Sequence, residues 1–150
     1  MHIQYKLPMP IEISRKQVDG IDIVAPKGRL KIGPPVEALR NTFDDLLASG
    51  RKRIVVDLTD VDYIDSSALG CLVVAHSKFE QVEGSVILFG LSERNVELLV
   101  ITKLATVFRT APSELDAINM SYPERGTGKR GFDILNFVQE QTGKKDEPQQ

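Results

Sequence analysis

Residues 54–70, IVVDLTDVDYIDSSALG, contain an apolar run, an acidic stretch and the start of a helix. Residues 54–58 are predicted to form a strand buried on both faces of a sheet, as strands with parallel neighbours usually are. Residues 59–64 are predicted to form a loop that leads into a helix beginning at Asp65 or Ser66. Functional sites of open α/β sheets commonly lie at the carboxyl ends of the strands, so this segment also predicts where the site lies.

The region before this segment predicts a hairpin and a helix. Asp19 and Gly20 lie between two short β-like runs, and an Asp-Gly pair in that position is a strong hairpin signal. Pro34 suits the first turn of a helix, and Gly50 follows the last apolar residues at helical spacing.

The region after the segment continues the alternation of helices and strands. Residues 86–89 are predicted as a buried strand, Ser92 caps a third helix, and Pro112 starts a fourth. Leu115 and Ile118 are predicted to form the buried side of that fourth helix. The pattern predicts an α/β fold with a mixed central sheet of four to five strands and about four helices packed mainly on one face.

Composition excludes several classes of protein. The chain has 150 residues and is 41% hydrophobic, which is enough for a core and argues against wholesale disorder. A formal net charge of -2 provides no basic field for direct nucleic-acid binding. The single cysteine, Cys71, can form neither an internal disulfide nor a Cys-based zinc site. No apolar run is long enough to span a membrane, and no signal peptide precedes the domain, so we expect a cytoplasmic protein.

The domain organisation follows from changes in composition along the chain. We expect an N-terminal extension over residues 1–10, one domain over 11–120 and a polar, glycine-punctuated linker over 121–131. Residues 132–150 are predicted to be a short amphipathic segment followed by a polar tail. The apolar residues of that segment are Phe132, Ile134, Leu135, Phe137 and Val138.

The acidic stretch suggests a phosphorylation switch. Four acids and no base occupy it, and Asp65 or Ser66 can simply cap the following helix. Capping does not explain the adjacent serines Ser66 and Ser67. A helix N-terminus tolerates a phosphate, and phosphorylation adds about -1.5 to -2 charges. Such a charge beside the acids would make the surface strongly anionic and repel a partner. The four acids are Asp57, Asp60, Asp62 and Asp65.

These motifs resemble a known family. The strand IVVDL, the loop TDVDYIDSSALG, the helix CLVVAHSKFEQVEG and the stretch GSVILFGLSERNVELLVITKLATVFRT are similar to the STAS domain of bacterial anti-sigma factor antagonists. The resemblance covers about residues 11–119. The D-S-S/T-G-L-G signature at the helix start is its most specific part.

The resemblance implies a non-enzymatic signalling module that works by partner switching. The unphosphorylated antagonist would bind an anti-sigma factor that is also a serine kinase, and this would release a sigma factor. Phosphorylation at Ser66, with Ser67 as the second candidate, would end binding, and a PP2C-type phosphatase would reset the switch. No cofactor or metal is implied. The expected partner-binding residues are Lys31, Asp60, Asp62, Tyr63, Asp65, Ser66, Ser67 and Ala68.

Two residues depart from the family pattern. Ala68 replaces the usual glycine after the serines, which would strain the backbone if that position needed a positive φ. Lys31 stands where many members carry an acid. Both leave open a second hypothesis, a constitutive scaffold subunit of a stress-signalling complex or of a lipid-transport system. Nucleotide binding by the domain and homodimer formation also stay open.

Enzyme sites are poorly supported by the sequence. The histidine nearest to Ser66, His76, lies ten residues further along the predicted helix, about 15 Å away at the helical rise per residue. GTGKRG at 126–131 lacks the Ser or Thr of a phosphate-binding loop and follows no strand.

Overall fold

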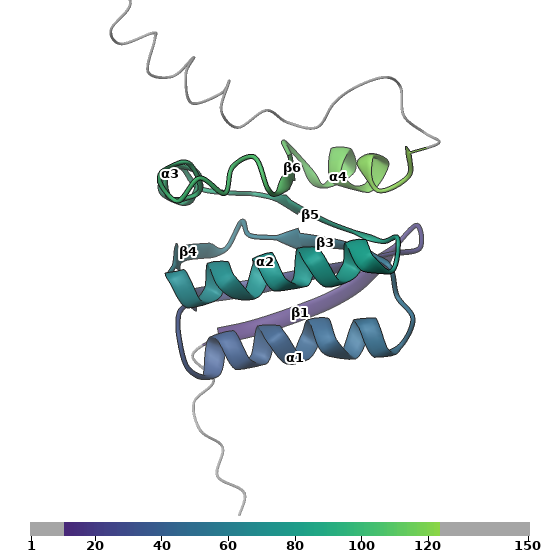
Figure 1. Cartoon of the computed structure of the whole chain (residues 1–150), viewed down its shortest axis with the longest axis horizontal. Coiled ribbons are helices and arrows are strands. Elements are labelled where there is room, and N and C mark those ends of the chain that lie inside the picture. The colour runs from purple at the N-terminus through teal and green to yellow at the C-terminus, as the bar shows by residue number, and fades with distance from the viewer. Residues whose placement is uncertain (1–10, 124–150) are drawn as a thin grey trace, which may run out of the picture.

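The computed structural model describes residues 11–123, so the N-terminal extension, most of the predicted linker and the segment 132–150 lie outside the described residues. Six strands and four helices form this region (Figure 1). The strands are β1 Ile11–Val18, β2 Ile21–Leu30, β3 Arg53–Asp57, β4 Val61–Ile64, β5 Ser85–Phe89 and β6 Arg109–Ala111. The helices are α1 Pro34–Ala48, α2 Ser66–Gln81, α3 Glu93–Ile101 and α4 Glu114–Met120.

The sheet is mixed, with the order β1-β2-β3-β5-β6. Strands β1 and β2 form an antiparallel hairpin, whereas β2, β3, β5 and β6 are parallel. Asp19 and Gly20 connect the hairpin with φ angles of 57° and 79°, the left-handed pair that a tight two-residue turn requires. The hairpin prediction is therefore confirmed.

Alternate residues of the central strands face two separate cores. Ile54 and Val56 of β3 pack in the larger core with residues of α1, α2 and α3, whereas Val55 points to the opposite face. That second face is covered by α4, through Ala117 and Ile118. Figure 1 shows α1 and α2 on one side of the sheet and α4 on the other. Because apolar side chains are needed on both faces, the strands read as continuous apolar runs.

The predicted α/β fold class is confirmed, and two details differ. Residues 61–64, expected to belong to a loop, form the short strand β4 beside the end of β2, which brings the sheet to six strands. Leu115, expected in the core, is 67% exposed. Helix α4 begins at Glu114 with Ser113 as its N-cap, and this phase turns Ala117 inward in place of Leu115, whereas Ile118 is buried as expected.

Candidate functional site

The start of α2 is held in place by Asp65. One carboxylate oxygen accepts a hydrogen bond from the Ala68 N–H at 2.9 Å, which caps the helix. The other accepts from the Ile32 N–H at 2.8 Å, and the Asp65 N–H donates to the Leu30 carbonyl at 3.0 Å. Asp65 therefore joins the end of β2 to the first turn of α2. This contact with the end of β2 goes beyond helix capping, which the sequence predicted for Asp65 or Ser66.

The two serines after Asp65 lie on different sides of α2. Ser66 is exposed and lines a groove against α3, whereas Ser67 is half-buried and lines a groove against α1. Successive helical residues are separated by about 100°, which puts the two hydroxyls on different faces. Among the described residues, no hydrogen bond partner is present for the Ser66 hydroxyl. The structure thus separates two candidates that the sequence placed side by side.

The groove between α2 and α3 has a volume of about 480 Å³ and combines polar and apolar groups. Ser66 and Leu69 line it from α2, and Arg94 and Ile101 line it from α3. Ile101 is 75% exposed, and Ile32, whose N–H is bonded to Asp65, is 72% exposed. Exposed aliphatic side chains that flank a groove are typical of protein–protein contact surfaces.

Two arginines lie near the acidic stretch, which the sequence did not indicate. The guanidinium of Arg29 lies 4.6 Å from the centre of the Tyr63 ring, and that of Arg94 lies 4.9 Å from it. Cation–π contacts of this kind hold both cations beside the site. Strand β2 and helix α3 thus bring positive charge to Tyr63 from distant parts of the chain, beside the acids of the stretch.

The four acids of the stretch have separate surroundings. Asp57 accepts hydrogen bonds from the N–H and the hydroxyl of Thr59 and so shapes the turn after β3. Asp60 lies exposed at that turn, and Asp62 is exposed on β4. Between residues 11 and 123 there is no group of three or more His, Cys, Asp or Glu side chains that could hold a metal ion.

Ala68 and Lys31 occupy very different positions. Ala68 is fully buried, so its methyl group packs in the core and is not accessible to a partner in this structure. It lies in α2 without the positive φ that would have strained it. Lys31 is exposed and precedes Ile32, at the loop that Asp65 anchors.

The residues missed by sequence reasoning are Ile32, Arg29, Arg94 and Ile101. Arg29 is the second-last residue of β2, Ile32 follows the end of that strand, and Arg94 and Ile101 belong to α3. Sequence reasoning could have pointed to these residues only through the general rule that the carboxyl ends of parallel strands lie at the same edge of a sheet. Within residues 11–123 no helix is long and apolar enough to cross a membrane.

Comparisons with known proteins agree with this geometry. Residues 12–117 match the family model described as the STAS domain. The anti-sigma-B factor antagonist of Listeria monocytogenes is 35% identical over 100 residues, which cover 65% of this chain and 83% of that protein.

Two solved structures share the fold. An anti-sigma factor antagonist from Mycobacterium paratuberculosis superposes with a TM-score of 0.69 and 20% identity, covering 78% of this chain and 98% of that one. The phosphorylated form of the Bacillus cell fate determinant SpoIIAA gives a TM-score of 0.59 and 20% identity, covering 74% and 100%. With most of its length matched, the chain belongs to the STAS domain family.

Proposed function

We propose that this chain is an anti-sigma factor antagonist that acts in the cytoplasm as a binding module. In the unphosphorylated form it binds an anti-sigma factor that is also a serine kinase, and a sigma factor is released. Phosphorylation of Ser66 ends this binding, and a PP2C-type phosphatase restores it. The 35% identity to an anti-sigma-B factor antagonist supports the role.

The observation that carries the switch is the placement of Ser66. Its hydroxyl is exposed at the first position of α2, and Ile101 lines the same groove. Ile32 is joined to the preceding residue, Asp65, by a hydrogen bond. A partner that covers these aliphatic side chains must therefore also cover Ser66.

The proposed inhibition arises from desolvation of the phosphate. A phosphoryl group on Ser66 would add about -1.5 to -2 charges to a surface that the partner must dehydrate. Burial of an uncompensated charge costs far more than a small apolar contact provides. Arg94 lines the same groove and reduces the local negative charge, so we attribute the effect to desolvation more than to repulsion by the nearby acids.

The proposed contact surface includes exposed and half-buried residues around Ser66. Asp65 contributes by holding the loop before α1 against the start of α2, whereas the buried Ala68 contributes only through the shape of the helix. The surface residues are Arg29, Lys31, Ile32, Asp60, Asp62, Tyr63, Ser66, Ser67, Arg94 and Ile101.

The decisive experiment compares Ser66→Ala with Ser67→Ala in the native cells. Phosphosite mass spectrometry is performed on each purified protein, with and without PP2C-type phosphatase treatment. We expect one phosphoryl group in the wild type and in Ser67→Ala, and none in Ser66→Ala. Full phosphorylation of Ser66→Ala would reject the assignment of the site.

The same variants test binding. We expect Ser66→Ala to retain the anti-sigma kinase constitutively in co-purification, and Ser66→Glu to bind it more weakly. If Ser66 stays unmodified in every growth and stress condition, the constitutive scaffold described above becomes the better explanation. A nucleotide-binding role would instead predict a measurable heat of binding in calorimetric titrations with GTP or ATP.

A further inference from the structure

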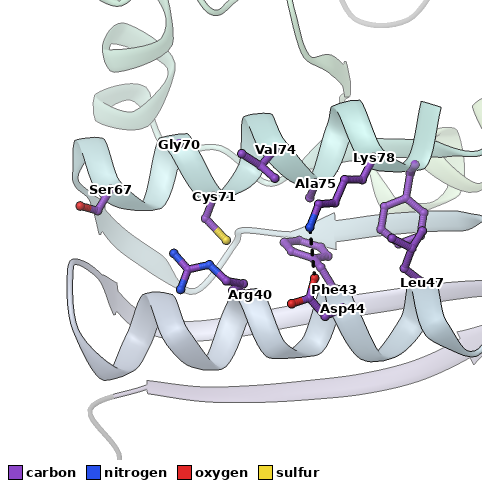
Figure 2. A pocket seen from close by; sticks show the side chains of 11 residues that line it. Arg40, Phe43, Asp44, Leu47, Ser67, Gly70, Cys71, Val74, Ala75 and Lys78 are labelled. Atoms are coloured by element: carbon purple, nitrogen blue, oxygen red, sulfur yellow. Dashed lines mark ion pairs between the residues drawn. The ribbon is translucent and has the colours of Figure 1, made fainter. Parts of the chain in front are cut away.

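A second groove lies between α1 and α2, on the side of α2 away from α3. It has a volume of about 330 Å³ (Figure 2). Phe43 and Phe79 provide its aromatic floor, Val74 is 51% exposed on its rim, and Cys71 lies buried beside them. Gly70 leaves the rim open, because a Cβ at this position would meet nothing within 4 Å. Arg40, Asp44 and Lys78 also line the groove, and the Lys78 ammonium lies 3.6 Å from the Asp44 carboxylate (Figure 2). A groove with an apolar floor and a charged rim is suited to a peptide segment that carries apolar side chains together with a charge.

The chain itself offers an occupant. Residues 132–138 carry five apolar side chains in the sequence FDILNFV, and they follow the last described residue, Pro123, closely. The function proposed above makes no use of them. A segment tethered to the same chain reaches its site at a high effective concentration, which lowers the affinity needed for stable docking.

The last described residues and the residues just beyond α1 contact the same β1–β2 turn, although α4 itself covers the face of the sheet opposite the groove. The Tyr122 hydroxyl donates to the Asp19 carbonyl, and the Tyr122 ring lies 4.6 Å from the guanidinium carbon of Arg53. Arg51, just beyond α1, donates to the carbonyl of Gly20 in the same turn. Leu47, in the last turn of α1, already lines the groove.

The length of the intervening chain limits how far residues 132–138 can lie from Pro123. Residues 124–131 can span at most roughly 26–29 Å, since a fully extended chain covers at most ~3.3–3.6 Å per residue. A span of that length exceeds the whole of α1, which at 15 residues is about 22 Å long.

We propose that residues 132–138 dock in the groove between α1 and α2 of their own chain. Docking covers Cys71 and Val74 on the α1 side of α2 and leaves the groove beside Ser66 open. This inference does not depend on the phosphorylation switch.

Cys71 is the only cysteine of the chain and provides the readout. Its rate of alkylation by iodoacetamide is measured on the full-length protein at a fixed pH, because burial raises the pKa of the thiol. We expect Phe137→Asp to speed labelling about tenfold, which corresponds to a docking free energy of about 1.4 kcal/mol. Gln139→Asp adds the same charge without removing an apolar group and should leave the rate unchanged.

A double-mutant cycle between segment and groove tests the location. Val74→Lys on the rim should remove most of the effect of Phe137→Asp, because the segment has then already left. The cycle also cancels any direct effect of the new lysine on the thiol. Val82→Lys changes another exposed valine at the end of α2, outside the groove, and should leave the Phe137→Asp effect intact.

Three results would overturn the proposal. Equal labelling of the wild type and Phe137→Asp would mean that the segment does not cover Cys71. Additive effects of Val74→Lys and Phe137→Asp would place the segment elsewhere. Labelling that slows as the protein concentration rises would identify a second copy of the chain as the occupant.

Discussion

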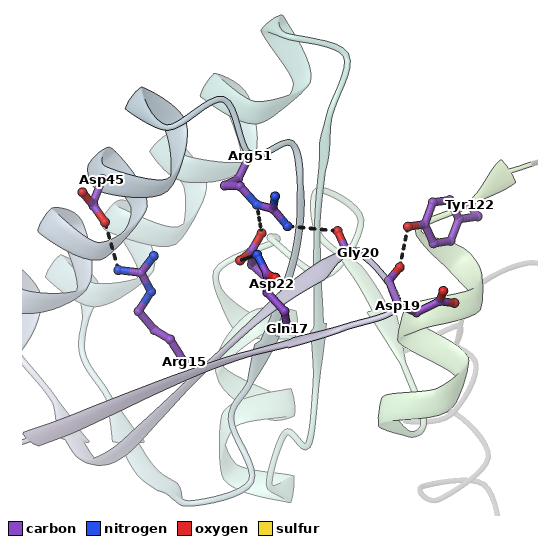
Figure 3. A network of polar contacts seen from close by, with 8 residues as sticks. All are labelled: Arg15, Gln17, Asp19, Gly20, Asp22, Asp45, Arg51 and Tyr122. Carbon is purple, nitrogen blue, oxygen red and sulfur yellow. Dashed lines mark hydrogen bonds and ion pairs between the residues drawn. The ribbon is translucent and has the colours of Figure 1, made fainter.

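The two ends of β2 carry polar groups that are used in opposite ways. At its beginning, Asp22 is 7% exposed and is paired with Arg51, which also donates to the Gly20 carbonyl (Figure 3). Gln17 donates to the other oxygen of the Asp22 carboxylate at 3.2 Å. At the far end of β2, past Leu30, the Asp65 carboxylate is also fully used, but Ser66 beside it is exposed without a partner among the described residues.

The difference indicates which end is built for stability and which for recognition. Polar groups that satisfy one another contribute to the fold and have little left to offer a ligand. At the carboxyl edge of the parallel strands, the exposed Ile101 lines a groove with the Ser66 hydroxyl, which has no hydrogen-bond partner among the described residues, and the exposed Ile32 is bonded to the neighbouring Asp65. Substitutions at the Asp22 end should therefore change stability, whereas those around Ser66 should change binding.

The largest loss of stability is expected for Arg51→Ala. It leaves the buried Asp22 carboxylate without its cation, and we expect a loss of about 2–3 kcal/mol, below the range for a fully buried pair because Arg51 is partly exposed. Arg15→Ala is the control, since its pair with Asp45 is solvent-exposed and worth less than about 1 kcal/mol. Urea unfolding measures both. Equal losses would show that the buried Arg51–Asp22 pair stabilises the fold no more than the exposed Arg15–Asp45 pair does.

Asp65→Ala is expected to have the next largest effect. It removes the helix cap and the bond to the Ile32 N–H, for a combined loss of about 2 kcal/mol. Asp65→Asn retains one acceptor oxygen and should lose about half as much.

Amide hydrogen exchange at Ile32 separates the two roles of Asp65. We expect faster exchange in Asp65→Ala, because the amide loses its only side-chain acceptor among the described residues. Unchanged exchange at Ile32 would mean that Asp65 acts only as a helix cap, and that the loop before α1 is held by other contacts.

Local sequence patterns predicted most of the fold. The Asp-Gly turn, the proline and glycine that bound α1, and the apolar runs of β3 and β5 each identify one element from neighbouring residues. Strand β4 was missed because it has only four residues, one of which is the acidic Asp62. Its pairing with the end of β2 is a long-range contact that no short window of sequence records.

The candidate site was predicted only in part for the same reason. Asp65 and Ser66 are neighbours in the sequence, so their motif could be identified directly. Arg29 and Arg94 lie far from it along the chain and meet only at the Tyr63 ring. The separation of Ser66 from Ser67 also depends on which helices pack on either side of α2, and this is a property of the assembled domain.

A pair of tyrosines provides a smaller but direct test of the two ends. Tyr122→Phe removes the donor to the Asp19 carbonyl at 2.6 Å and should cost about 1 kcal/mol. Tyr63→Phe retains the ring that Arg29 and Arg94 contact, and we expect a change within about 0.5 kcal/mol. Thermal unfolding of both variants measures the difference. A larger loss of stability for Tyr63→Phe than for Tyr122→Phe would contradict the view that the polar contacts at the beginning of β2 stabilise the fold more than those at its far end.

The smallest change in stability is expected for Ser66→Ala, within about 0.5 kcal/mol of the wild type. Asp65 supplies the cap, Ser66 lies at the first helical position, and alanine is the best helix former. Urea unfolding of Ser66→Ala, with Ser67→Ala as the matched control, checks this. A loss above about 1 kcal/mol would give the Ser66 hydroxyl a structural role in the helix start. The proposed switch needs the opposite, a residue that the fold does not require, because a phosphoryl group must be added and removed there without unfolding the domain.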